Sequence, residues 1–218
     1  MCGRYSDPAA KAFEGYGLKL RMGYITSFNV SPGSFQPIII KNSPLRIEYA
    51  KWGLIPSWSK DFKPSFTTFN ARKEGLLESR VFKRPFLKQR CLVLAQAFYE
   101  WKTMEDGEKV RFVIKAKDRD YFSFAGFYDI WKDVESKEFY SYTLITGEPG
   151  PKVSKIHTRE AVILKKDDED KWLDKETSQD ELMALLKPYP DELTETYPAM
   201  INSIKRDMDS EELLKPLN

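Results

Sequence analysis

Cysteine and histidine are scarce in this chain, whose 218 residues include two cysteines and one histidine. Two thiols cannot form a disulfide framework, and with a single imidazole they exclude a zinc site built from cysteine and histidine. The sequence also lacks an apolar run of membrane-spanning length, and its start is too polar for a signal peptide. We therefore expect a cytoplasmic protein, nucleoid-associated if bacterial, that uses no metal or other cofactor and contacts no membrane.

Linkers, repeats and low-complexity segments are also missing. A length of 218 residues with 41% hydrophobic and 31% charged residues suits one globular domain, so we expect a single domain over residues 1–218 and a monomer. The net charge of +2 conceals a gradient, because residues 1–110 hold 18 Lys and Arg against 10 Asp and Glu, whereas the remainder holds 17 against 23. A basic first half is compatible with a polyanionic partner on one side of the molecule.

Strand-like runs dominate the chain. Apolar, β-branched and aromatic residues separated by turns predict strands over residues 35–40, 45–55, 91–102, 110–115, 121–131, 139–145 and 161–164. Asp106-Gly107 predicts a hairpin turn, Ser178 with Glu181 predicts a capped helix, and a short helical pattern spans residues 8–16. We therefore expect an α+β fold, with a mostly antiparallel β-sheet curled into a barrel-like core and flanking helices.

Cys2 carries the most distinctive chemistry. A small side chain at position 2 permits removal of Met1, which leaves an α-amine and a thiol on adjacent carbons. Their reference pKa values, about 8 for the amine and about 8.5 for the thiol, supply a reactive fraction of each near neutral pH, and the neighbouring Arg4 favours the thiolate. Such an aminothiol condenses with an aldehyde to an imine, and the thiolate then closes a five-membered thiazolidine. The alternative is that position 2 carries cysteine by chance.

Three further polar residues are candidates for acid–base or positioning roles. His157, the sole histidine, suits general acid or base catalysis near neutral pH, although structural histidines are commoner. Glu100 lies among aromatic residues, where burial would raise its pKa and let it carry protons, unless it faces solvent at an alternating strand position. Asn70 follows a strand-like segment at residues 65–69, where its amide either orients a polar intermediate or belongs to an ordinary turn.

The segment from residue 70 to residue 90 is basic, with seven Lys and Arg against two Glu. Trp52 and Trp58 lie just upstream of it. Basic side chains between exposed aromatic rings suit single-stranded nucleic acid, because cations follow the phosphates and rings stack on the bases. Two core tryptophans are the alternative. Cys91 opens an apolar run and is interpreted as an unreactive core thiol.

Seven short motifs follow one another along the chain. They are MCGRY at 1–5, NVSPG at 29–33, WGLIPSW at 52–58, NARKE at 70–74, RCLV at 90–93, FYEW at 98–101 and IHTR at 156–159. AGFY at 125–128 and Asn202-Ser203 fit the same series. In this order the chain resembles, over nearly its whole length, the SOS-response-associated peptidase (SRAP) family.

The resemblance implies an enzyme of the DNA damage response that captures abasic sites in single-stranded DNA as a covalent thiazolidine cross-link. It implies hydrolase- or lyase-like chemistry, with Met1 removed either autocatalytically, as a peptidase would, or by an aminopeptidase. Cys2 would supply amine and thiolate and Asn70 would hold the N-terminus. Glu100 would manage protons at the amine, and His157 would help to open the sugar ring. The DNA contacts that the resemblance implies are Arg4, Pro32, Trp58, Arg72, Arg80 and Thr146.

Other function classes remain open at the level of sequence. Class II glutamine amidotransferases also begin Met-Cys-Gly and use the cysteine as an N-terminal nucleophile, but their downstream arginine and asparagine-glycine motifs are not found here. A non-enzymatic single-strand-binding module would use the basic, aromatic first half and leave Cys2 idle. A cysteine peptidase acting on other proteins is supported by the family's name alone.

Overall fold

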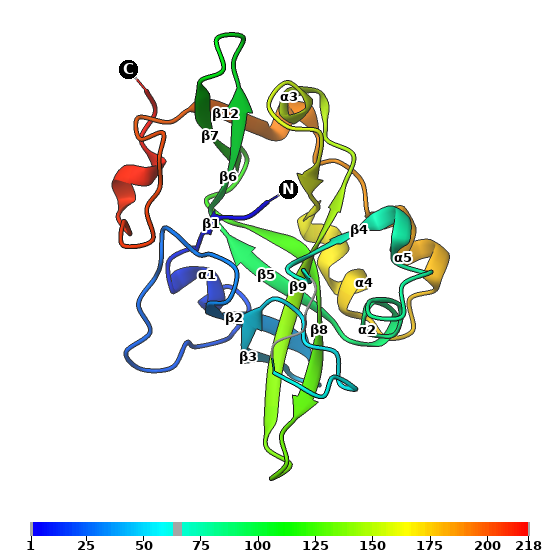
Figure 1. Cartoon of the computed structure of the whole chain (residues 1–218). Helices are drawn as coiled ribbons and strands as arrows, with labels where there is room; N and C mark the ends of the chain where they lie inside the picture. Colours follow the sequence, from blue (N-terminus) through cyan, green and yellow to red (C-terminus); the bar gives the residue numbers. More distant parts are fainter. Residues whose placement is uncertain (1, 63–66, 218) are drawn as a thin grey trace.

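Five strands close into a barrel in the structure, a computed structural model that describes residues 2–62 and 67–217 (Figure 1). The barrel strands are β2 (Phe35–Lys41), β3 (Leu45–Trp52), β5 (Arg90–Ala95), β8 (Phe122–Lys132) and β9 (Glu138–Gly147). The order β9-β3-β2-β5-β8 returns to β9; the β3–β9 pair is parallel and the other four pairs are antiparallel. Each barrel strand therefore has a neighbour on both sides, which removes exposed sheet edges.

The remaining strands extend the barrel wall and build a second sheet. The wall is extended by β4 (Asn70–Arg72) and β10 (Glu160–Ala161), which pair with β9, and by β11 (Ile163–Leu164), which pairs with β8. The second sheet is antiparallel, in the order β1 (Tyr5–Ser6), β6 (Ala97–Thr103), β7 (Lys109–Ala116) and β12 (Thr194–Pro198). The α+β fold with a barrel-like core is confirmed.

The helices are short. They are α1 (Lys11–Glu14), α2 (Lys83–Lys88), α3 (Pro151–Ser154), α4 (Glu169–Leu173) and α5 (Gln179–Leu185), with the 3-10 turns η1 (Lys73–Gly75), η2 (Lys166–Asp168), η3 (Asp191–Leu193) and η4 (Glu211–Leu214). In Figure 1, α2, α4 and α5 gather on one side of the barrel, where Phe86, Trp172 and Leu182 share one buried cluster. Within the described ranges, none of these helices has the length and apolar character needed to cross a bilayer.

The barrel interior is closely packed between β5 and β8. Gly126 of β8 lies opposite Cys91 of β5, and a Cβ at Gly126 would come within 3.0 Å of both the Cys91 sulfur and a methyl group of Val93. Glycine therefore lets the two strands pack this closely without displacing either side chain. Cys91 is fully buried and burial raises its pKa well above the ordinary value, which confirms its interpretation as an unreactive core thiol.

The local turn and cap predictions are confirmed. Asp106-Gly107 lies in the turn between β6 and β7, with Gly107 at a φ of 86°, which favours glycine. The Ser178 side chain accepts a hydrogen bond from the Glu181 N–H, and the Glu181 carboxylate bonds back to Ser178, which forms the capping box at the start of α5.

The single strand expected over residues 91–102 is wrong. The structure has two strands in different sheets, β5 and β6, separated by Gln96. The Gln96 amide donates to the Ser6 hydroxyl (2.9 Å) and to the Asp7 carbonyl (2.6 Å), so this break is fixed by the N-terminal segment. The helix expected over 8–16 is shorter, over Lys11–Glu14, and the strand-like segment at 65–69 lies partly outside the described residues.

Candidate functional site

The N-terminal strand lies between two other segments, which fixes the position of Cys2. Tyr5 pairs with Phe98 of β6 on one side and bridges to Val30 on the other. The Arg4 carbonyl accepts a hydrogen bond from the Tyr99 N–H at 3.0 Å. Continuing this antiparallel register toward the N-terminus brings the chain just after Cys2 alongside the middle of β6. The start of the described chain is thus held by main-chain pairing.

Asn70 contacts the backbone of Cys2. It begins β4, which lies parallel to β9 with Asn70 opposite Leu144. Its Nδ2 donates to the Cys2 carbonyl oxygen at 2.7 Å. The Asn70 Oδ1 is buried and accepts no hydrogen bond from the described residues. A buried amide oxygen in this state is available to a donor on a bound substrate.

Glu100 and His157 form a pair beside this N-terminal strand. The distance between Glu100 Oε2 and His157 Nε2 is 3.9 Å. The Glu100 side chain is 4% exposed, and burial raises its pKa to about 7. Burial lowers the pKa of His157 below its ordinary value, so the imidazole is mostly neutral at pH 7. A carboxyl group that titrates near neutrality next to a neutral imidazole suits general acid–base catalysis.

The backbone after His157 fixes the orientation of its ring. His157 Nδ1 lies 3.0 Å from the Arg159 N–H and 3.2 Å from the Arg159 carbonyl oxygen, which leaves Nε2 facing Glu100. Arg159 is itself fixed, because its guanidinium makes two 2.9 Å bonds to the Glu74 carboxylate and one of 2.7 Å to the Thr146 carbonyl. This chain of contacts orients the imidazole.

Cys2 is not an activated thiol in this state. It is fully buried, and its sulfur lies 3.7 Å from the Arg4 carbonyl oxygen. Burial, followed by the negative charge of Glu100, raises the pKa of the thiol above its ordinary value. Met1, whose removal the sequence-based mechanism requires, lies outside the described residues.

The basic residues expected to contact DNA differ in how firmly they are held. Arg72 at the end of β4 and Arg80 are exposed. Arg4 is partly buried and its guanidinium donates to the Asn29 side-chain oxygen. Arg72 lies opposite Thr146 in the β4–β9 register, so one strand carries both Asn70 of the inner site and a surface arginine.

The two tryptophans differ sharply. Trp58 is 63% exposed, as a ring that stacks on a base must be, and Pro32 is partly exposed. Trp52 is 1% exposed, and its indole donates to the Phe69 carbonyl at 2.8 Å inside the barrel. The expectation that Trp52 adds to a stacking surface is therefore wrong, and it is a core residue. Thr146 is fully buried, so its hydroxyl lies beneath the surface and a part in DNA binding stays a prediction.

Three supporting residues are absent from the sequence-based candidates. Glu74 and Arg159 support the His157 ring, and Asp129 supports the loop that carries Trp58. Asp129 is 3% exposed, and its carboxylate accepts from the Ser57 N–H at 2.8 Å, which holds the loop that presents Trp58. The available indication was an acidic residue inside an otherwise apolar strand.

The fold and the site define a class of protein: a β-barrel protein that holds a cysteine near its N-terminus against a buried carboxyl–imidazole pair. No three His, Cys, Asp or Glu side chains among residues 2–62 and 67–217 gather as metal ligands.

A comparison with protein families matches residues 1–203 to the SOS response associated peptidase (SRAP) family, and the chain belongs to this family. The resemblance drawn from the motifs is confirmed.

Relatives of known name agree. The chain is 37% identical to "Abasic site processing protein YoaM" of Bacillus subtilis, over 100% of this chain and 99% of that protein. It is 31% identical to "Abasic site processing protein HMCES" of Gallus gallus, over 86% of this chain and 66% of that protein. A crystal structure of a protein from Bacteroides thetaiotaomicron has a TM-score of 0.83 at 28% identity, covering 91% of this chain and 92% of that one.

Proposed function

We propose that this protein captures abasic sites in single-stranded DNA through Cys2, as a covalent thiazolidine cross-link formed after Met1 has been removed. One observation carries the proposal: Asn70 bonds to the Cys2 carbonyl at 2.7 Å, while the Glu100–His157 pair, 3.9 Å apart, lies beside the same N-terminal strand. The names of the SRAP relatives, which are abasic site processing proteins, support the same substrate.

The reaction begins with the sugar and the amine. An abasic site is mostly a closed hemiacetal in equilibrium with an aldehyde. As the ring opens, the neutral His157 takes the proton of the hemiacetal hydroxyl and returns a proton to the ring oxygen, which becomes a free hydroxyl group. Glu100, with a pKa raised to about 7, takes a proton from the Cys2 ammonium so that the free amine attacks the carbonyl carbon.

Formation of the thiazolidine uses the proton that Glu100 took from the Cys2 ammonium. Glu100 returns its proton to the hydroxyl of the carbinolamine, which leaves as water and gives an iminium ion. The Cys2 thiol gives its proton to the Glu100 carboxylate, and its sulfur bonds to the former aldehyde carbon, which closes the ring. Starting from the ammonium and the thiol, the sequence releases one proton and one water that carries the aldehyde oxygen, so no oxidant is needed. Capture by sulfur removes the imine before it promotes β-elimination and strand cleavage.

Exposed basic and aromatic side chains support a single strand as the substrate. Arg72 and Arg80 are exposed and suit phosphate contacts, while the exposed ring of Trp58 suits stacking on a base. Holding the strand at these points raises the effective concentration of the sugar carbonyl at the N-terminus. We propose that the protein acts as a monomer in this role.

Intact-mass measurement tests the proposal in one experiment. The purified protein should have the mass of the chain without Met1. After mixing with an oligonucleotide that carries one abasic site, its mass should rise by that of the oligonucleotide less one water. An undamaged oligonucleotide of the same length is the control and should leave the mass unchanged. A protein that retains Met1 and still cross-links, or one that binds both oligonucleotides only in a salt-reversible way, would overturn the mechanism in favour of other chemistry or of a simple binding module.

A further inference from the structure

The C-terminal segment, residues 199–217, folds back over the second sheet, and Figure 1 shows it in orange to red along β7. Arg111 of β7 is fully buried and anchors the segment at two points. Its Nε donates to the Ile201 carbonyl at 2.6 Å and its Nη2 donates to the Leu213 carbonyl at 2.9 Å. Both ends of the segment are thus attached to the sheet that holds the N-terminal strand.

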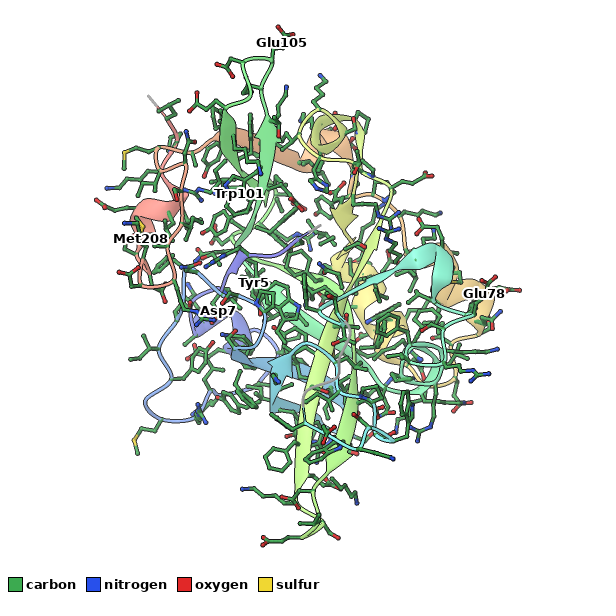
Figure 2. All side chains as sticks on the ribbon, in the orientation of Figure 1. Tyr5, Asp7, Glu78, Trp101, Glu105 and Met208 are labelled. Atoms are coloured by element: carbon green, nitrogen blue, oxygen red, sulfur yellow. The ribbon has the colours of Figure 1, made fainter. Side chains whose placement is uncertain are left out.

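The middle of this segment contacts Asn29, which also holds Arg4. Asn29 is 8% exposed, and its Nδ2 donates to the carbonyl oxygens of Lys205 (3.0 Å) and Met208 (2.6 Å). Its Oδ1 accepts from the Arg4 guanidinium. Figure 2 labels Met208 on this part of the segment. One buried amide therefore links the C-terminal segment to an arginine two residues after Cys2.

Arg206 projects from the turn that Asn29 holds. The turn spans residues 205–208 and is closed by a 3.3 Å bond from the Met208 N–H to the Lys205 carbonyl. Arg206 is exposed, and its positive charge, after the larger effect of burial, lowers the pKa of Arg4. Asn29 contacts both Arg4 and the turn, and the positive charges of Arg4 and Arg206 repel each other in the free protein, so an anion bound to both would offset that repulsion.

We propose that the turn at residues 205–208 is part of the DNA-binding surface, where Arg206 and Arg4 bind one phosphate of the strand and Asn29 positions both. The inference rests on the proposed function and extends it, because the turn lies beyond the family match, which ends at residue 203. The ligand is a phosphodiester of single-stranded DNA. Arg206 is the direct contact and Asn29 is a positioning residue.

The salt dependence of binding tests this contact. Fluorescence anisotropy with an undamaged single-stranded oligonucleotide gives Kd as a function of salt concentration. Arg206→Gln should weaken binding roughly three- to tenfold and lower the slope of log K against log salt by about 0.7, the value for one phosphate contact on a single strand. Arg206→Lys should retain the slope. Lys175→Gln, which removes one exposed positive charge between α4 and α5, is the matched control and should retain both Kd and slope.

Asn29→Ala provides a second arm of the experiment. It should weaken binding and lower the slope. The double variant with Arg206→Gln should lose less affinity than the two single variants added together, because both changes affect one site. A wild-type slope in Arg206→Gln, or a slope loss of the same size in Lys175→Gln, would overturn the assignment. These outcomes are distinct from failure of the proposed function, because cross-linking of an abasic oligonucleotide by the wild-type protein is measured separately.

Discussion

The site around Cys2 and the exposed side chains proposed to contact DNA, such as Arg72 and Trp58, have opposite environments. In the site, Asn70 and Glu100 are 9% and 3% exposed and their positions are set by strand pairing. On the surface, Trp58 is 63% exposed and its loop is fixed from below by a buried carboxylate. Burial changes the chemistry of the first group, whereas exposure leaves the second group free to meet a large ligand.

The difference predicts two kinds of response to substitution. Buried groups that share one hydrogen-bonded site act as a unit, so single changes should have large and non-additive effects on chemistry. Exposed groups that each contact one phosphate or base should contribute in small, nearly additive steps to affinity. The four predictions below test this division in order of decreasing expected effect on the chemistry of adduct formation.

Substitution of Cys2 should have the largest effect. Cys2→Ala keeps an amine but has no sulfur, so we expect no stable adduct by intact mass or denaturing electrophoresis. Cys2→Ser should likewise give no stable adduct, and the imine that it forms should lead to strand cleavage, measured as shortened oligonucleotide. A stable adduct of either variant would contradict the assignment of the thiol as the ring-closing group.

Glu100→Gln should slow adduct formation by roughly 10²–10⁴-fold, the usual range for loss of a general acid–base group. Because burial raises the pKa of Glu100 to about 7, its acid form is lost as pH rises through neutrality. The wild-type rate should therefore change near pH 7 wherever proton transfer is limiting. The Gln variant should lose this inflection, measured as single-turnover rates from pH 5 to pH 9.

Glu160 provides the matched control for that experiment. It is 2% exposed and burial raises its pKa to about 7, like that of Glu100, but its carboxylate accepts from the Gly150 N–H at 2.8 Å. Glu160→Gln should keep both the rate and the inflection.

The same variant tests the effect of this buried carboxylate on stability. The pKa of Glu160 is higher in the folded protein than in the unfolded chain, so its ionisation lowers the free energy of unfolding increasingly from about pH 4.5 to pH 7. Glu160→Gln should therefore melt at a higher temperature than the wild type at pH 8.

Asn70→Ala should reduce the rate roughly tenfold or more, because the 2.7 Å bond that fixes the Cys2 carbonyl is lost and the N-terminal strand becomes less ordered. Asn70→Asp is the sharper variant, since a carboxylate has nearly the same shape but cannot donate to that carbonyl. It should be at least as slow as the alanine variant. If the aspartate variant reacts at the wild-type rate, donation by the amide is not what positions the N-terminus.

A second difference, between features that depend on local contacts and features that depend on distant ones, explains how much of the fold could be predicted from the sequence. The turn at Gly107 and the capping box at Ser178 depend on residues within a few positions of each other, and both were predicted correctly. The break at Gln96 depends on Ser6 and Asp7, about 90 residues away, and no local pattern indicates it. The barrel could be predicted as a class because alternating strands separated by turns favour it.

The site itself could not be assembled from local patterns. The chemistry of Cys2, Glu100 and His157 suggested candidates one by one, but their proximity was implied by the family resemblance alone. The pairing of β1 with β6 brings the N-terminal strand to Glu100, and the pairing of β10 with β9 helps to place the segment after His157; both pairs join segments that are not adjacent in the chain. The support from Glu74 through Arg159 to the His157 ring was missed for the same reason.

Trp58 and Trp52 provide the most direct test, because the same residue type is exposed at one position and buried six positions away. Trp58→Ala should leave the melting temperature nearly unchanged, since the ring is 63% exposed, while weakening single-strand binding by about 1–3 kcal/mol, the usual contribution of one stacked base. Trp52→Ala should cost about 3–5 kcal/mol of folding free energy, because it empties a site that is 1% exposed. Thermal melts and anisotropy on the same two proteins separate these effects. If Trp58→Ala binds single strands like the wild type, the exposed ring does not stack on DNA and affinity depends on the arginines.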